Sequence, residues 1–237
     1  MTNAFEEFPN VVTLKHFDTN DFNQIPDYWD IKYKSEWLEE QAPKFGEIIC
    51  KHGLHSVFGV ALLHRHFNLN ENERLIRNYT SSEFSVSCGR RDYAENTIPY
   101  IWRSRRNGSG TDLFPLEYCD PNPKLRKIAE AHWQHSLRRP EFFEEFFELV
   151  YELDAENVVC LVALYQKDAF TIGAGQSLFE DTFDNSRYIT LRVGDNYPDG
   201  QYPNDSIKTN WWFTPSRETL DSSICASHCY AHCKHSK

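Results

Sequence analysis

The sequence predicts an α+β fold in which one mainly antiparallel sheet, or two pseudo-equivalent sheets, carries a few helices packed on one face. Short segments rich in β-branched and aromatic residues alternate with turn residues along most of the chain. Only a few segments show helical periodicity. Across its 237 residues, 40% are apolar and 15% aromatic, which is enough for a rigid core.

Composition excludes several classes of protein. The chain has 25 Lys and Arg against 35 Asp and Glu, a net charge of −10 that argues against a nucleic-acid partner. The longest apolar runs, Val57–Leu63 and Val158–Tyr165, are far shorter than the ~20 residues of a transmembrane segment. The acidic N-terminus lacks the features of a secretory signal. We therefore expect a cytoplasmic protein whose thiols are reduced.

The first half of the chain begins with a polar extension, residues 1–27, which we expect to lie over the body as a loop or short strand. A helix is predicted near 34–42, and a second is predicted from Pro43 because proline is tolerated in a first turn. Gly53 then ends that helix. Strands are expected at 57–67, 74–80 and 84–88, followed by a hairpin formed by 98–105 and 112–119.

The second half repeats this order. Helices are predicted at 124–137 and 140–153, the latter with a wide stripe of Phe and Leu opposite a row of Glu. Strands are expected at 158–166, 178–182, 188–193 and 210–214. Because each half has an aromatic-bearing helix, a buried strand and further strands, the fold could contain a pseudo-duplicated helix–strand–strand unit.

Arginine is concentrated between Arg65 and Arg106, a segment with eight Arg and no Lys. Arginine suits bidentate pairing with carboxylate or phosphate. We expect these side chains to face the acidic segments 1–50 and 138–160, with an anion-binding groove as the alternative.

The C-terminus carries the densest set of potential metal ligands. Thiols and imidazoles together favour zinc or copper(I) over hard cations. If this segment were helical, its three Cys would share one stripe and two of its His would form the adjacent one. The six donors are Cys225, His228, Cys229, His232, Cys233 and His235.

Two other interpretations of this Cys/His-rich tail remain open. Its spacing lacks the Cys-x2-Cys knuckle of a zinc finger, so it could be a disordered tail with incidental metal affinity. Reversible acylation of the three Cys would instead place the tail on a membrane. Tail-mediated contact with a protein or a membrane is therefore a possible partner interaction.

A second candidate metal site is His64-Arg-His66 with Glu71. On a strand, alternate residues share a face, so both imidazoles would project the same way and could hold one ion. They could equally be hydrogen-bonded, half-buried side chains at a strand end. His132, on the apolar side of its helix, is a weaker candidate for a ligand or general base.

The segment Leu62-Leu-His-Arg-His-Phe67, together with the Cys/His-rich ending, resembles an uncharacterised group of proteins from filamentous fungi. The resemblance implies a non-secreted eukaryotic protein, and proteins of this kind often accompany fungal secondary metabolism.

These observations lead to two hypotheses. In the first, a single globular domain at 28–214 carries a metal-binding tail at 215–237, and the protein is an accessory protein that binds zinc or copper. In the second, it is a metal-dependent enzyme in which His64 and His66 hold the ion, Glu71 or His132 completes the site, and neighbouring Arg side chains fix an anionic or carbonyl substrate.

Overall fold

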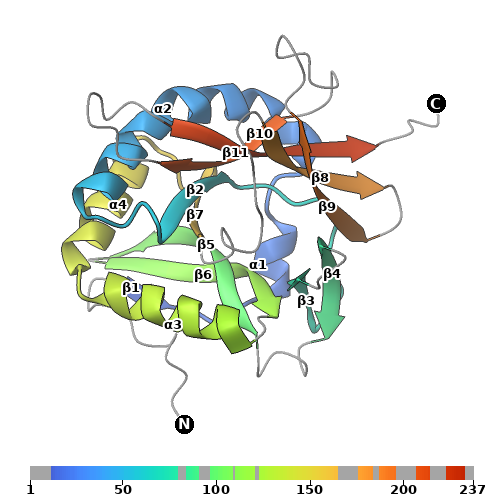
Figure 1. Ribbon diagram of the computed structural model, residues 1–237, viewed down its shortest axis with the longest axis horizontal. Helices are drawn as coiled ribbons and strands as arrows, with labels where there is room; N and C mark the ends of the chain where they lie inside the picture. The colour runs from blue at the N-terminus through green and yellow to red at the C-terminus, as the bar shows by residue number, and fades with distance from the viewer. Residues whose placement is uncertain are drawn as a thin grey trace.

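The computed structural model describes residues 12–79, 84–90, 97–108, 110–120, 123–164, 176–183, 187–195, 207–213 and 223–232. It confirms the α+β class: a mainly antiparallel sheet with packed helices (Figure 1). The helices are α1 (Thr19–Asn23), the 3-10 helix η1 (Tyr28–Ile31), α2 (Lys32–Lys51), α3 (Pro123–Leu137) and α4 (Pro140–Glu152). Within the described part of the chain, no helix has the length and apolar character needed to span a bilayer.

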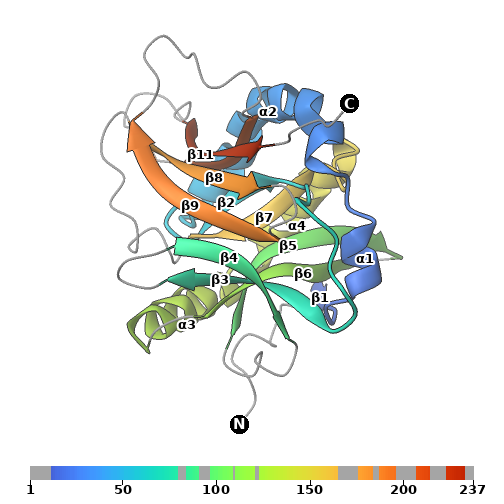
Figure 2. The same cartoon turned by 90° about the vertical axis from the view of Figure 1, so that its right-hand side faces the viewer.

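The strands form one sheet that closes on itself. Their order is β1-β6-β3-β4-β9-β8-β11-β10-β2-β7-β5, and β5 pairs back onto β6. Figure 2 shows the run from β11 through β8 and β9 to β4 and β3. The strand bounds are β1 Val12–Leu14, β2 Phe58–Leu62, β3 Glu73–Tyr79, β4 Phe84–Arg90, β5 Ile98–Asn107, β6 Gly110–Asp120, β7 Val159–Ala163, β8 Gln176–Phe183, β9 Tyr188–Asp195, β10 Ile207–Phe213 and β11 Ser223–His232.

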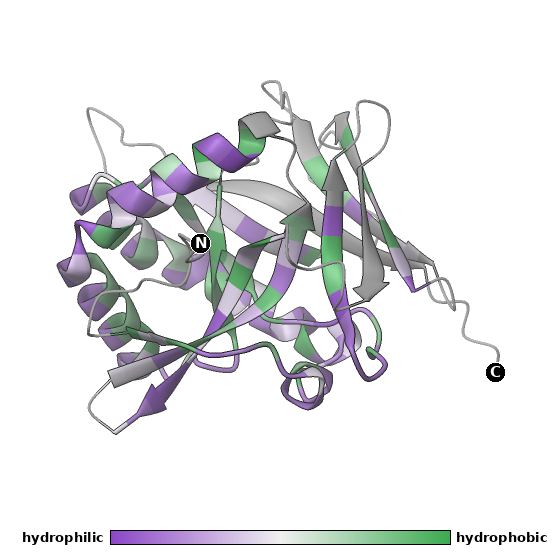
Figure 3. Cartoon of the chain, turned by 90° about the horizontal axis from the view of Figure 1, so that it is seen from below, coloured by the Kyte–Doolittle hydropathy of each residue, from purple (hydrophilic) through white to green (hydrophobic). Residues whose placement is uncertain are grey.

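Closure divides the core into two parts. Along β2, Phe58, Val60 and Leu62 face the helices, whereas Ala61 points into the ring of strands; β7 alternates in the same way. Because both faces of these strands are buried, their sequences are continuously apolar rather than alternating. The helices carry both polar and apolar residues along their length (Figure 3), as expected for elements that cover one face of a sheet.

The prediction of two helices separated at Pro43 is wrong. Lys32–Lys51 is one helix with Pro43 in its interior. Interior proline costs about 3 kcal/mol. However, Leu38, Ala42, Phe45 and Ile49 form one continuous stripe on either side of it, and all four are fully buried. Burying large apolar side chains contributes about 1.5–3 kcal/mol each, so packing of the whole stripe outweighs the proline.

The helix–turn–strand unit occurs twice with the same geometry. α2 leads into β2 and α4 leads into β7, the two helices pack together, and β2 and β7 are antiparallel neighbours. The Leu63 amide donates to the Val158 carbonyl at 2.8 Å, and the Leu164 amide donates reciprocally to the Val57 carbonyl at 2.8 Å. The predicted pseudo-duplication of a helix–strand–strand unit stays a prediction.

Both ends of the described chain join the sheet. In the predicted extension 1–27, β1 pairs with β6 and α1 packs Phe22 into the interior of the ring. In the predicted tail, β11 lies between β10 and β8. The backbone from 223 to 232 is therefore a strand, not a helix, because two neighbouring strands provide hydrogen-bonding partners that the local sequence does not reveal.

Candidate metal centre

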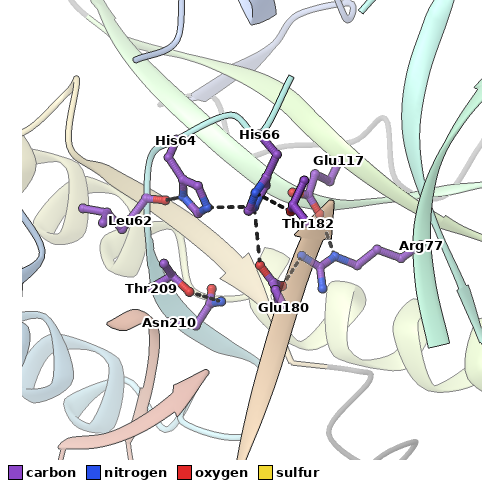
Figure 4. Close-up of polar contacts among 9 residues, drawn as sticks. All are labelled: Leu62, His64, His66, Arg77, Glu117, Glu180, Thr182, Thr209 and Asn210. Atoms are coloured by element: carbon purple, nitrogen blue, oxygen red, sulfur yellow. Dashed lines mark hydrogen bonds and ion pairs between the residues drawn. The ribbon is translucent and has the colours of Figure 1, made fainter. Parts of the chain in front are cut away.

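Two histidines and one glutamate converge inside the ring of strands. His64 and His66 follow the end of β2, and Glu180 lies on β8. Their ligand atoms all lie within 4.8 Å of one another, the only such group of three or more among the described residues. Figure 4 shows the two imidazoles side by side above the Glu180 carboxylate.

The chain around Arg65 is what orients the two histidines. The strand expected at 57–67 ends at Leu62, but Arg65 pairs with the N-terminal segment. Its amide donates to the Pro26 carbonyl at 3.0 Å, and its carbonyl accepts from the Tyr28 amide at 3.1 Å. Its side chain also reaches the Asp27 carboxylate at 3.2 Å. Because the chain is held extended here, His64 and His66, which flank Arg65, project from the same face, as the sequence predicted.

The hydrogen bonds of His64 determine its tautomer. Its Nδ1 lies 2.8 Å from the Leu62 carbonyl oxygen, which can only accept, so Nδ1 carries the proton. In the neutral imidazole, Nε2 of His64 therefore presents a lone pair. This lone pair faces Nε2 of His66 at 3.1 Å. A backbone carbonyl bonded to the far ring nitrogen is the usual support of a histidine metal ligand.

His66 can adopt either tautomer. Its Nδ1 lies 2.7 Å from the Thr182 hydroxyl, which can donate or accept. If the hydroxyl donates, the Nε2 proton of His66 bonds to His64. If the hydroxyl accepts, both Nε2 lone pairs point into the same space, which is the arrangement that a cation requires. Thr182 therefore lets the pair exist with or without an ion.

Burial keeps His66 uncharged. Its side chain is 5% exposed, and this burial lowers the pKa of His66 to about 3; a proton on the neighbouring His64 and the charge of Arg77 act in the same direction, and Glu180 opposes them. The ring of Tyr28 stacks on the imidazole with centroids 6.0 Å apart. His66 is thus neutral near pH 7, the form in which histidine binds metals.

Glu180 is held by a buried arginine. Its side chain is 3% exposed; Oε1 accepts from Arg77 Nη2 at 2.8 Å, while Oε2 lies 3.9 Å from His66 Nε2. Arg77 also donates from Nε to Glu117 at 2.6 Å. The ring of Tyr100 lies under the guanidinium, 4.7 Å from its centre. One carboxylate oxygen is therefore fixed by Arg77 and the other is directed at the imidazoles (Figure 4).

A small cavity borders this group. Its volume is about 20 Å³, and a water molecule needs at least about 10–15 Å³. Its polar wall includes His64, Glu180, Arg77, Glu117 and Asn210. The rest of its wall is apolar apart from one thiol and consists of Phe22, Ala61, Leu62, Leu63, Ile101, Leu116 and Cys160. Burial raises the pKa of the Cys160 thiol, so that wall stays uncharged.

The distances suit a transition-metal ion. Two imidazole nitrogens about 2.05 Å from one zinc ion lie about 3.1–3.4 Å apart at angles of roughly 100–110°. The observed separation of His64 and His66 Nε2 is 3.1 Å. The Glu180 oxygen lies 3.9 Å from His66 Nε2, and the three ligand atoms lie within 4.8 Å of one another, so Glu180 must move towards the two imidazoles to complete the site.

The other sequence candidates lie elsewhere. Glu71 is exposed and lines a separate cavity beside α1. His132 lies on α3, whose buried residues Ala129 and Trp133 pack on the helix-covered face of the sheet rather than inside the ring. Neither joins His64 and His66. The backbone of Cys225, His228, Cys229 and His232 belongs to β11, while the side chains of all six tail donors, and Cys233 and His235 entirely, lie outside the described residues.

Several site residues were not predicted: Glu180, Thr182, Glu117 and Tyr28. A usable signal was present for Glu180, because it shares its strand face with the apolar Leu178, and a buried glutamate is costly unless it has a partner. The predicted pairing of arginines with acidic segments is confirmed for Arg65 with Asp27, Arg105 with Asp21 and Arg106 with Glu148. Arg77 instead pairs with Glu117 and Glu180, which lie outside those segments.

No protein-family model, curated protein or solved structure matches this chain. Its function must therefore be inferred from the chemistry of the His64, His66 and Glu180 group.

Proposed function

We propose that this protein is a metal-dependent enzyme in which His64, His66 and Glu180 hold one divalent transition-metal ion, most suitably zinc. The observation that carries the proposal is the 3.1 Å approach of the two Nε2 atoms, with the His64 lone pair directed into the gap by the Leu62 carbonyl. Neutral histidine is the ligand form, and the low pKa of His66 favours it.

The ligand set supports zinc and an open coordination position. Two imidazoles and one carboxylate form the set used by several catalytic zinc sites, which leave a position for water; iron(II) can also use such a set. Calcium and magnesium prefer oxygen ligands and do not suit two imidazoles. Three protein ligands beside a cavity of about 20 Å³ leave room for one further small ligand.

The reaction class that fits is metal-assisted hydrolysis or hydration. A bound divalent ion can polarise a carbonyl or phosphoryl oxygen and lower the pKa of a bound water. The chain's own contribution is to orient the ligands through Leu62, Thr182 and Arg77 and to surround the site with buried residues. These are the supporting contacts that set metal affinity in such centres.

The proposal is tested by measuring metal content. Protein purified without chelators or a His tag, under reducing conditions with zinc supplied, should hold about one zinc per chain, and the His64→Ala/His66→Ala variant should hold none. The matched control is a full-length variant with Cys225, Cys229 and Cys233 changed to Ser, which should keep its zinc. Truncation of the tail is unsuitable because it would remove β11 from between β10 and β8.

The opposite pattern of metal content would favour the hypothesis of a metal-binding tail. Zinc that survives loss of both histidines but disappears in the triple Cys→Ser variant would assign metal binding to the tail and overturn this proposal. The catalytic part is tested with carbon dioxide, a substrate small enough for this site, whose hydration is followed with a pH indicator. Zinc-dependent hydration, absent from His64→Ala/His66→Ala, would support an enzyme; no hydration with zinc bound would leave a metal-binding protein only.

We also propose that the protein is cytoplasmic and that it is related to the fungal group that its sequence resembles. The free thiols of Cys50, Cys119 and Cys160 are compatible with a reducing compartment. Expression of a fluorescent fusion in a filamentous fungus would test the location.

A further inference from the structure

We propose that the metal-loaded site binds one small monoanion as an additional ligand, in the cavity between Glu180, Arg77 and Asn210. This inference rests on the proposed function, because the metal ion supplies the charge that the anion neutralises. It specifies the class of ligand that the open coordination position accepts.

The first argument is the balance of buried charge. Among the described residues, Arg77 contributes one positive charge and Glu117 and Glu180 contribute two negative charges, and histidine binds a metal in its neutral form. The side chains of Arg77 and Glu180 are each 3% exposed and that of Glu117 is 14% exposed, so water screens this cluster poorly. The cluster alone carries −1, and a divalent ion changes it to +1.

A net charge of +1 in a poorly solvated interior is unfavourable unless an anion accompanies it. One monoanion brings the total to zero. A neutral ligand would leave +1, whereas a dianion would change the total to −1. Charge balance therefore selects a singly charged ligand, which is hydroxide when no other anion is present.

The second argument is space. The cavity of about 20 Å³ holds about one water-sized group. The side chains of Phe22, Ile101 and Leu116 close its apolar side, and all three are buried. A hydrated or branched anion would have to displace these side chains. A compact or rod-shaped ion needs only to place one donor atom in the cavity.

The charge argument predicts opposite effects for substitutions of Glu117 and Arg77, which are not themselves ligands of the ion. In Glu117→Gln the metal-loaded cluster carries +2, which should strengthen anion binding. In Arg77→Met it carries 0, which should weaken it. The double variant Arg77→Met/Glu117→Gln returns to +1, the same total as the unmodified protein. It is the matched control for charge, because it contains both substitutions and keeps the total charge of the unmodified protein.

The experiment uses full-length protein loaded with Co²⁺ and titrates it with azide at fixed pH and ionic strength, following the visible absorption of the metal. We expect saturable binding of one azide per cobalt, at least threefold tighter in Glu117→Gln and at least tenfold weaker in Arg77→Met. The double variant should lie within about threefold of the unmodified protein. Benzoate, a bulky monoanion, should bind at least tenfold more weakly than azide.

The result also separates this inference from the proposed function. If the protein binds no cobalt, the proposed function fails first. If cobalt binds but azide leaves the spectrum unchanged, or benzoate binds as well as azide, the anion site is wrong and the metal site stands. Should Arg77→Met fail to fold, Glu117→Gln and the double variant still decide: equal azide affinity in these two, despite their different charge, would overturn the inference.

Discussion

Gly53 and Asp154 end α2 and α4 in the same left-handed backbone conformation, with φ of 68° and 52°. The residue after each donates its amide back to its helix: Leu54 to the Ile49 carbonyl at 2.9 Å, and Ala155 to the Val150 carbonyl at 2.8 Å. Matching turns therefore precede two strands that pair antiparallel, β2 and β7, and the chain that leaves β2 carries His64 to Glu180 on β8.

These two turns should respond oppositely to substitution. Glycine adopts the left-handed region without a Cβ penalty, whereas other residues pay for it. Asp154→Gly should therefore raise the free energy of unfolding by about 0.5–1 kcal/mol, and Gly53→Ala should lower it by about 1 kcal/mol. Urea unfolding followed by circular dichroism measures both. If Asp154→Gly lowered the free energy of unfolding, the Asp154 side chain would stabilise the fold by more than its left-handed backbone conformation destabilises it.

Gly46 should tolerate no larger residue. It lies on the buried face of α2, and a Cβ at this position would overlap the ring of Phe213 on β10. We expect Gly46→Ala to lower the free energy of unfolding by about 1–3 kcal/mol, the usual range for overpacking. Adding Phe213→Leu should recover part of the loss, measured in the same unfolding assay. An unchanged stability in Gly46→Ala would show that α2 can shift away from β10.

Stability of the metal-free protein should fall in acid because of His66. Its folded-state pKa is lowered to about 3, below the ordinary value of 6.5, so between these pH values the unfolded state binds the extra proton. The associated stability is present above pH 6.5 and is lost as pH falls towards 3, at up to about 1.4 kcal/mol per pH unit. Unfolding in EDTA between pH 7.5 and 5 tests this. The His66→Gln variant should lack the histidine part of that slope, and an identical slope in both proteins would contradict the assignment.

Replacing Arg77 should lower the free energy of unfolding much more than replacing Arg105. Arg77 is buried between Glu117 and Glu180, so Arg77→Met leaves carboxylates buried without their partner and should cost about 3–5 kcal/mol. Arg105, which lies 3.5 Å from Asp21 with its side chain 45% exposed, is the control. Arg105→Met should cost less than about 1 kcal/mol. Comparable losses in the unfolding assay would show that the Arg77 network is not the more important ion pair.

Zinc should stabilise the folded protein through the same three ligands. A ligand that binds only the folded state at 1,000 times its Kd adds about 4 kcal/mol. We expect the melting temperature to rise with zinc concentration in the unmodified protein and to stay constant in His64→Ala/His66→Ala. Glu180→Gln should show a smaller rise because it keeps the imidazoles but loses the charged ligand. A rise in the double His→Ala variant equal to that of the unmodified protein would place the stabilising zinc elsewhere.

The sequence by itself determined the elements whose signal is local. The apolar runs of β2 and β7, the stripe of α4 and the alternation of the two histidines around Arg65 are all visible within a few residues, and the structure contains each of them. Short-range periodicity predicts which residues share a face because backbone geometry fixes that relation regardless of what the element packs against.

Only the tertiary structure decided which residues meet. Glu180 reaches His66 from more than a hundred positions away, β11 is a strand because β10 and β8 flank it, and α2 continues through Pro43 because its whole stripe is buried. Glu71, although near the histidines in sequence, lies on the surface instead. Pairing of distant strands and burial of charge depend on closure of the whole sheet, and no local pattern encodes that closure.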